Sequence, residues 1–316
     1  MMHRNDSSRT RAKILAAFAC VYLFWGSSFV AVRYSAQLVH PAFVAGIRYL
    51  LAGLLLLVFL FVRRTSLRLG RRDLLQVTGL GLLMFSCNTL LLSYGGKELP
   101  AGLIALLLST IPLFIALLEF CLPGRSGPTP LGWFGIVTGF VGVAILLKRS
   151  LGEGLLSPGA PMAAAGLVTA SFAWALGSVL LKRMTFQAPP LVCTCWQMLV
   201  GGAVDVLIGL AAGGRHTSHW NAGACLSLLF LAVFATLVGY TSYSFLLRKV
   251  PITLVATYAY INPLIAVVLG WILLHEPLAS NQWLGLVTVL TSVAVVVSTR
   301  SHTRYVAPPK IKISQT

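Results

Sequence analysis

The chain has 316 residues, of which 57% are hydrophobic and only 10% are charged, and its mean hydropathy is +0.87. Soluble domains have roughly one half apolar and about one quarter charged residues, so this composition excludes a soluble domain and makes lipid the main solvent of the chain. The formal net charge of +17 would favour nucleic acid as a partner of a soluble protein. Here the basic residues lie mainly between apolar stretches, so no nucleic-acid binding is expected.

Ten apolar stretches follow one another, separated by polar, glycine or proline residues. A bilayer core of about 30 Å needs about 20 apolar residues per spanning helix, and the stretches have that length. The alternating pattern of membrane β-strands is absent from the sequence, so helices are predicted. The stretches begin near Ile14, Pro41, Leu74, Pro100, Leu131, Pro161, Pro190, Ala222, Pro251 and Gln282.

The first stretch follows a basic tail, residues 1–13. A tail and stretch of this kind can belong to a signal peptide, but the length and the lack of a small-residue cleavage site favour a retained helix. Trp25 lies about a dozen residues into this helix, roughly 17 Å deep, which is too deep for an interfacial anchor. Trp25 and the nearby Ser28 are therefore candidate substrate-binding residues.

Charged residues inside the predicted spans are few and costly, so each needs an explanation. Arg48 lies about 10 Å from the outer end of the second helix, and its side chain either extends to the interface or faces a cavity. Asp205, about 22 Å along the seventh helix, is placed where it could pair with Arg48. Glu119 lies about 28 Å along the fourth helix, which favours a cytoplasmic interface position.

Two polar residues of the third and fourth helices are further candidates for substrate binding. Asn88 is the sharpest, because a buried amide in hydrocarbon faces either another helix, through a hydrogen bond, or a cavity. Ser109 lies near Pro112, about 18 Å into the fourth helix. Proline removes a helix hydrogen bond, so Pro112 predicts a helix break near the bilayer midplane, with a packing kink as the alternative.

The second half of the chain repeats the first. Residues 81–121 align without a gap on 232–272, so Pro112 corresponds to Pro263, 151 positions later. Elsewhere the offset is 149, as between Trp25 and Trp174, or between Arg48 and Gln197. Since a paired half with interrupted helices is typical of a secondary transporter, the paired prolines are predicted hinges beside a substrate cavity. The second half adds the candidate substrate-binding residues Trp174, Tyr240, Tyr258 and Asn262.

Asn262 has a second interpretation, because it directly precedes Pro263 and its amide can cap the interrupted backbone. Six cysteines fall in or at the edge of apolar stretches and read as packing residues, and the six histidines lie in tails or at helix ends. No metal site, cofactor or catalytic residue is expected, and a membrane-embedded enzyme is disfavoured because the sequence lacks clustered carboxylates or an activated nucleophile. A glycine run in the fifth helix serves packing within the bundle or a homodimer.

The basic residues predict the orientation in the membrane. Only Arg33, Lys97, Lys148, Arg149 and Arg215 fall on one side. The remaining basic residues outside the helices fall on the other side, which the positive-inside rule makes cytoplasmic together with both termini. Five crossings per half is an odd number, so the two halves must be inverted. The expected fold is an all-α integral membrane protein with ten transmembrane helices as two inverted five-helix repeats, residues 14–149 and 160–299, followed by a basic cytoplasmic tail, residues 300–316.

The sequence resembles the EamA domain of the drug/metabolite transporter superfamily over nearly its whole length. The resemblance rests on five groups of residues, at 24–29, 46–52, 250–264, 275–278 and 283–285. One departure is Arg125, which stands where the second half has Glu276. The resemblance implies ten helices in inverted repeats and the transport of amino acids, metabolites, nucleotide-linked sugars or drugs.

The expected function is a secondary transporter, an exporter, of a small organic metabolite such as an amino acid or amphipathic compound. It would work by alternating access around a midplane cavity in the inner (cytoplasmic) membrane, and its transport is expected to be coupled to protons. A passive facilitator would share every one of these features and differ only in coupling.

Overall fold

The computed structural model describes residues 2–121, 129–146, 158–274, 287–288 and 291, and their regular structure is entirely helical. The helices in the first half are α1 (Met2–Leu38), α2 (Pro41–Val62), α3 (Arg71–Leu80), η1 (Gly81–Cys87), α4 (Asn88–Glu98), α5 (Ala101–Leu108), α6 (Ile111–Cys121) and α7 (Pro130–Leu146). Those in the second half are α9 (Ala160–Arg183), α10 (Pro190–Ala211), α11 (Gly214–Thr217), α12 (Ala222–Phe230), η2 (Leu231–Val238), α13 (Gly239–Lys249), α14 (Ile252–Val255) and α15 (Tyr258–Leu274).

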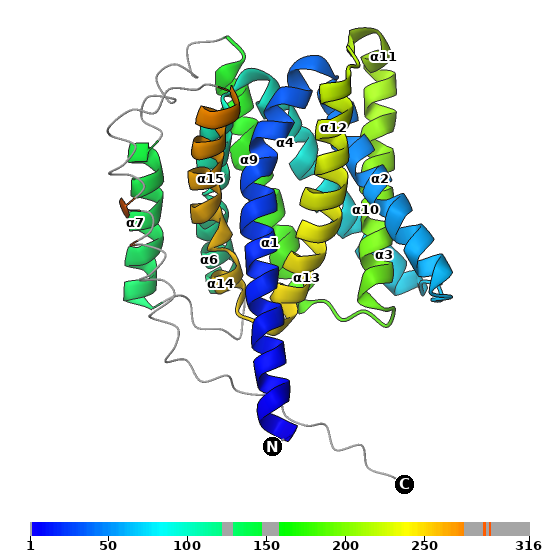
Figure 1. The fold of residues 1–316 in the computed structure, drawn as a ribbon, viewed down its shortest axis with the longest axis vertical. Coiled ribbons are helices and arrows are strands. Elements are labelled where there is room, and N and C mark those ends of the chain that lie inside the picture. Colours follow the sequence, from blue (N-terminus) through cyan, green and yellow to red (C-terminus); the bar gives the residue numbers. More distant parts are fainter. Residues whose placement is uncertain (1, 122–128, 147–157, 275–286, 289–290, 292–316) are drawn as a thin grey trace.

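The helices form one bundle whose axes lie roughly along its long direction, with α7 at one edge and the start of α1 projecting from one end (Figure 1). Seven helical segments in the described part are long and apolar enough to cross a membrane. The α7 and α15 helices are shorter, at 17 residues each. Almost all of the tenth predicted helix, from Gln282, and the whole of the predicted tail, residues 300–316, lie outside the described residues.

The surface of the bundle is apolar and its interior holds polar groups. Phe61 is 76% exposed and Phe120 is 67% exposed, although both are large apolar side chains. Buried polar residues instead include Arg48, Asn88 and Asp205. An extensive apolar surface of this kind marks contact with lipid rather than water. The chain is therefore a multi-pass helical membrane protein.

Two π-helical segments, which the sequence pattern did not predict, lie at corresponding places in the two halves. The η1 segment joins α3 to α4, and the η2 segment joins α12 to α13. At the repeat offset of 151, η1 corresponds to residues 232–238, which fall within η2. The π-helix is rare and frequently occurs at functional sites, because its wider turn redirects the side chains that follow.

The helix breaks differ from the prediction in the second half. In the first half, α5 ends at Leu108 and α6 begins at Ile111, so Pro112 lies in the first turn of α6, where its missing N–H costs nothing. In the second half, the break at Ala256–Thr257 comes before α15, and Pro263 lies inside that helix. The helix break that was predicted at Pro263 therefore lies about six residues before it in the sequence.

Side-chain hydroxyls stabilise both breaks. In the first half, Ser109 and Thr110 donate to the carbonyls of Leu106 and Leu107, at 2.6 and 2.7 Å. Ser171 of α9 also donates to the Leu107 carbonyl, at 3.1 Å. In the second half, Thr257 donates to the Leu254 carbonyl at 2.7 Å. These contacts satisfy backbone groups that would be costly to leave unpaired in a membrane.

Packing between the halves follows the repeat. The α1 helix packs on α13 and α15, and its counterpart α9 packs on the corresponding helices of the first half, α4 and α6. Likewise α2 contacts η2, while α10 contacts η1. The first helix of each half therefore packs against helices of the other half.

Hydrogen bonds identify which segments share an end of the bundle. Arg33, near the end of α1, donates to the carbonyls of Gly96 and Lys97 at 3.0 and 2.9 Å, and Gly159, just before α9, packs against Glu98. The α1 helix therefore ends where α9 begins, and the two run in opposite directions. At the other end, Lys182 donates to the Val250 carbonyl at 2.8 Å. We call this the basic end, defined by Arg71, Arg72, Lys182, Arg183, Arg248 and Lys249.

Candidate functional site

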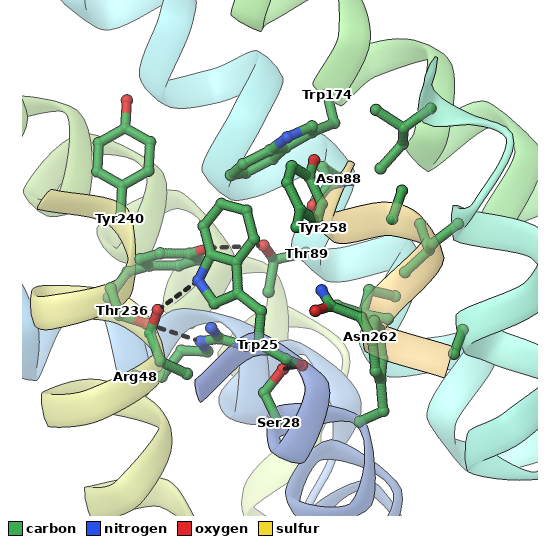
Figure 2. Close-up of a pocket in the computed structure, with 18 residues that line it drawn as sticks. Trp25, Ser28, Arg48, Asn88, Thr89, Trp174, Thr236, Tyr240, Tyr258 and Asn262 are labelled. Atoms are coloured by element: carbon green, nitrogen blue, oxygen red, sulfur yellow. Dashed lines mark hydrogen bonds between the residues drawn. The ribbon is translucent and has the colours of Figure 1, made fainter. Parts of the chain in front are cut away.

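A cavity of about 70 Å³ lies between the two halves, beside the helix breaks, η2 and the start of α4. Leu108 and Ile111, on either side of the first break, contribute to its wall, as do Ala235 and Thr236 of η2. Figure 2 shows the side chains that line it. The sequence-predicted candidates that line it are Trp25, Ser28, Arg48, Asn88, Trp174, Tyr240, Tyr258 and Asn262.

An aromatic cluster forms the core of the wall. The ring of Trp25 lies 5.3 Å from that of Trp174 and 4.8 Å from that of Tyr258, both edge to face. Tyr243 packs against the same indole at 5.0 Å. Edge-to-face geometry is favoured by the quadrupoles of aromatic rings. Trp25 also donates from Nε1 to the carbonyl of Ala235 at 2.8 Å, which fixes its ring against η2 (Figure 2).

Arg48 faces the cavity, so the alternative in which its side chain extends to the interface is wrong. Only 5% of the residue is exposed, and its Nε donates to the Thr236 hydroxyl at 3.0 Å. Its guanidinium carbon lies 5.0 Å from the ring centroid of Tyr49, a cation–π distance. Tyr49 in turn shares a 3.0 Å hydrogen bond with Thr89.

Both asparagines line the cavity, and each amide also has a backbone partner. Asn88 donates from Nδ2 to the carbonyl of Ala170 at 2.8 Å, an interhelical hydrogen bond, and it also lines the cavity. Asn262 lines the cavity too, and with its amide nitrogen facing the carbonyls of Tyr22 and Tyr258 it donates to them at 3.2 and 3.1 Å. Each amide thus holds neighbouring backbone in place at the cavity wall.

Two buried polar groups of the wall, the indole Nε1 of Trp174 and the hydroxyl of Tyr258, make no hydrogen bond of good geometry within the described part of the chain. Both lie close enough to the Tyr243 hydroxyl to interact with it. Buried donors without partners are costly and usually have a functional reason. A polar group of a bound molecule would supply the missing partner.

Several predicted residues do not line the cavity. Ser109 is buried but serves the first break, and Glu119 is half-buried near the end of α6. Asp205 is fully buried in α10 and accepts from the Ser86 hydroxyl at 2.5 Å, so the pairing with Arg48 is wrong. The reason is geometric, because η1 brings Ser86 against α10.

A larger hollow of about 690 Å³, which we call the vestibule, lies at the basic end. It is lined by Leu181, Lys182, Met184, Phe186, Ala188, Pro190, Cys193, Thr194, Gln197, Ser244, Leu247, Arg248, Lys249, Val250 and Pro251. A hydrogen bond joins the two linings, because Tyr240 of the cavity donates to Oε1 of Gln197 in the vestibule at 3.0 Å. Nε2 of Gln197 is buried without a partner.

Sequence reasoning did not select Tyr49 or Thr236 as site residues. The signal for Tyr49 was its place beside Arg48, because aromatic faces attract guanidinium groups. The role of Thr236 depends on η2, which no sequence pattern announced. In the described part of the chain, no three His, Cys, Asp or Glu residues gather as a metal site would require.

A helical membrane bundle in which two similar halves enclose a polar and aromatic cavity has the architecture of a membrane transporter. The model of the EamA-like transporter family matches residues 12–148 and again 161–298. The chain belongs to this family, and the duplicated match establishes two copies of the EamA domain. Because the family and its relatives are named as transporters, the protein is a transporter and not an enzyme.

Relatives of known sequence align with this chain over most of their length. The Escherichia coli K12 protein named uncharacterized inner membrane transporter YedA is 32% identical over 286 residues, 90% of each chain. The Bacillus subtilis protein named uncharacterized transporter YvbV is 28% identical, over 91% of this chain and 92% of its own. A solved crystal structure matches with a TM-score of 0.73 over 91% of this chain and 98% of the other, and its 17% identity makes it evidence for the fold alone.

Proposed function

We propose that the protein is a secondary transporter that exports a small organic metabolite by alternating access to the central cavity. The observation that carries this proposal is the makeup of the cavity wall. Trp25 and Trp174, which correspond in the repeat, meet there at 5.3 Å. A site shared by two similar halves can open to either side when one half moves against the other.

The proposed arrangement is ten helices in two inverted repeats, residues 14–149 and 160–299. The opposite directions of α1 and α9 and the reciprocal packing of the halves support it. The basic end is proposed to face the cytoplasm, with both termini there, because cytoplasmic segments carry the excess of Lys and Arg. The inner membrane is the proposed location, and the name of the relative YedA supports it.

The contact between Tyr240 and Gln197 is the proposed inner barrier. One side of it is the cavity and the other is the vestibule, so its opening would connect the cavity with the basic end. Its hydrogen bond is neutral, with a net contribution of about 1 kcal/mol, and the Tyr240 ring also packs against Phe85 at 4.6 Å and Trp174 at 6.2 Å. Export is the proposed direction, since the vestibule offers a wide entrance at the end assigned to the cytoplasm.

Coupling to protons is proposed through Asp205. Its carboxylate is buried in α10, one oxygen accepts from Ser86, and the other has no hydrogen bond to the described residues. It also lies near enough to interact electrostatically with Tyr49 of the cavity wall. A passive facilitator is the competing function, and accumulation against a gradient that a protonophore abolishes separates the two.

Flux into proteoliposomes, screened with amino acids, organic acids, amines and neutral amphipathic compounds, tests the proposal. We expect at least one compound to cross, and Trp174→Ala and Asn88→Ala to reduce its flux at unchanged protein abundance. Asp205→Asn should retain flux down a gradient and lose proton-driven accumulation. If no compound in any class crosses faster than in empty liposomes, the transport function is wrong. If abundance falls with flux, the two residues are structural.

A further inference from the structure

The central cavity carries one fixed charge. Among its described lining residues, Arg48 is the only charged side chain, and it is 95% buried from solvent. An arginine stays protonated in proteins, so the cavity is cationic. Burying a cation without an anionic partner is costly, and natural sites satisfy such a group with a carboxylate, further hydrogen bonds or a ligand.

The described residues leave most of this guanidinium unsatisfied. Nε bonds to Thr236, and the face stacks on Tyr49, but no carboxylate reaches the group. Asp205, the buried acid of the facing half, is held by Ser86 instead. Figure 2 places the guanidinium on the cavity wall beside Thr236 and below the ring of Trp25. The Nη groups are thus the donors available to a bound molecule.

We propose that the cargo is a monocarboxylate with a small apolar body, whose carboxylate binds the Nη groups of Arg48. This assignment rests on the proposed transport function and specifies its substrate class. The apolar body would pack against Trp25, Trp174 and Tyr258, and a fork of two N–H donors matches a carboxylate in bidentate geometry.

The same lining disfavours other charged cargoes. A zwitterionic amino acid brings an ammonium group, and no acidic side chain lies among the described lining residues to receive it. An amine would place a second cation beside Arg48. A phosphate carries more negative charge than one guanidinium neutralises, whereas one carboxylate matches it. The volume of about 70 Å³ further favours a small molecule.

The test compares matched probes on the purified full chain in detergent. Each acid of a series from propionate to phenylacetate and indole-3-acetate is measured by thermal shift beside its neutral amide, with phenethylamine and phenylalanine as charged controls. A cargo stabilises the folded state by mass action. We expect an acid to raise Tm while its amide, of the same shape, binds at least about tenfold more weakly, because hydrogen bonds to charged groups are the stronger ones.

Variants then assign the effect to Arg48. Arg48→Gln should remove the difference between acid and amide, and Arg48→Lys should retain part of it. Arg33→Gln is the matched control, since Arg33 bonds to carbonyls at the far end of α1 and should leave the difference intact. If Arg48→Gln does not fold, the acid–amide comparison on the unaltered chain still decides the matter.

Proteoliposome flux separates this inference from the transport function. Flux of an amine, an amide or an amino acid, with no acid bound and no effect of Arg48→Gln, would overturn the carboxylate assignment and leave transport standing. Equal binding of acid and amide would also overturn it. An absence of flux for every class would overturn the transport function itself.

Discussion

Arg48 and Gln197 occupy corresponding positions in the two halves, yet they face different spaces. Arg48 lies on the wall of the central cavity and bonds to Thr236, whereas Gln197 lies on the vestibule and accepts from Tyr240. The two halves therefore share one backbone arrangement, and different residues at corresponding positions give each half a different role. One half carries the charge that would hold the cargo, and the other carries the contact that would close the path.

The largest expected effect on stability concerns the start of α3 and of its counterpart α12, where the halves also differ. Asp73 accepts from the backbone amides of Gln187 and Ala188, at 3.0 and 2.9 Å, and so ties the first half to a loop of the second. The side chain of Asn221, before α12, accepts from Ala224 of its own helix. We expect Asp73→Ala to destabilise by about 2–4 kcal/mol, since it removes two charge-assisted bonds.

Asn221→Ala is the matched variant and should cost about 1 kcal/mol, as an ordinary N-cap does. Thermal denaturation in detergent, followed by the loss of monodisperse protein, measures both. Equal Tm values for the two variants would show that the two bonds of Asp73 stabilise the protein no more than an ordinary N-cap does.

The next effect separates the two tryptophans of the cavity. Trp25 donates to the Ala235 carbonyl, while the indole nitrogen of Trp174 has no such bond. We expect Trp25→Phe to lower stability by about 1–2 kcal/mol because it strands that carbonyl. Trp174→Phe loses the same ring volume without stranding a carbonyl, so we expect its Tm to fall less than that of Trp25→Phe, and its flux to fall because the cavity wall changes. The same assay on both variants would contradict this account if their Tm values fell equally.

A smaller effect is expected at the inner barrier. Tyr240→Phe keeps the ring and removes the hydrogen bond to Gln197, which is worth about 1 kcal/mol, or roughly a fivefold shift in the open fraction. The shift should appear as faster alkylation of a cysteine at Ala105 of the cavity by a maleimide added at the basic end. Tyr243→Phe, which loses the bond to Ser178 at 2.6 Å, is the control. An unchanged rate in Tyr240→Phe would remove this contact from the barrier.

The smallest effect is a pH dependence at the turn between α1 and α2. Partial burial, with a lesser contribution from the positive charge of Lys97, lowers the pKa of His40 below its usual value. The unfolded chain then binds the proton more readily, so stability is lost as the pH falls through about 6.5. We expect a small fall in Tm between pH 7.5 and 5.5 that His40→Asn removes. An identical pH profile in the variant would contradict the assignment.

The sequence was sufficient for the membrane helices of the described residues, the repeat and most of the wall, because apolar length and the pairing of Trp25 with Trp174 depend on local composition and spacing. It was insufficient for η1 and η2, since a widened turn arises from packing across the halves. For the same reason the contact of Arg48 with Thr236 was missed, and Asp205 was paired with the wrong partner. The second break was misplaced because it lies at Thr257, whose hydroxyl donates to the Leu254 carbonyl, and not at Pro263.

Side-specific labelling of the central cavity tests the transport mechanism most directly. A chain in which Ala105→Cys is the sole cysteine would be reconstituted in one orientation and treated with an impermeant maleimide from one side and then, separately, from the other. Alternating access predicts reaction from both sides, with protection by a bound cargo. Reaction from only one side, under conditions in which the protein is folded, would contradict it.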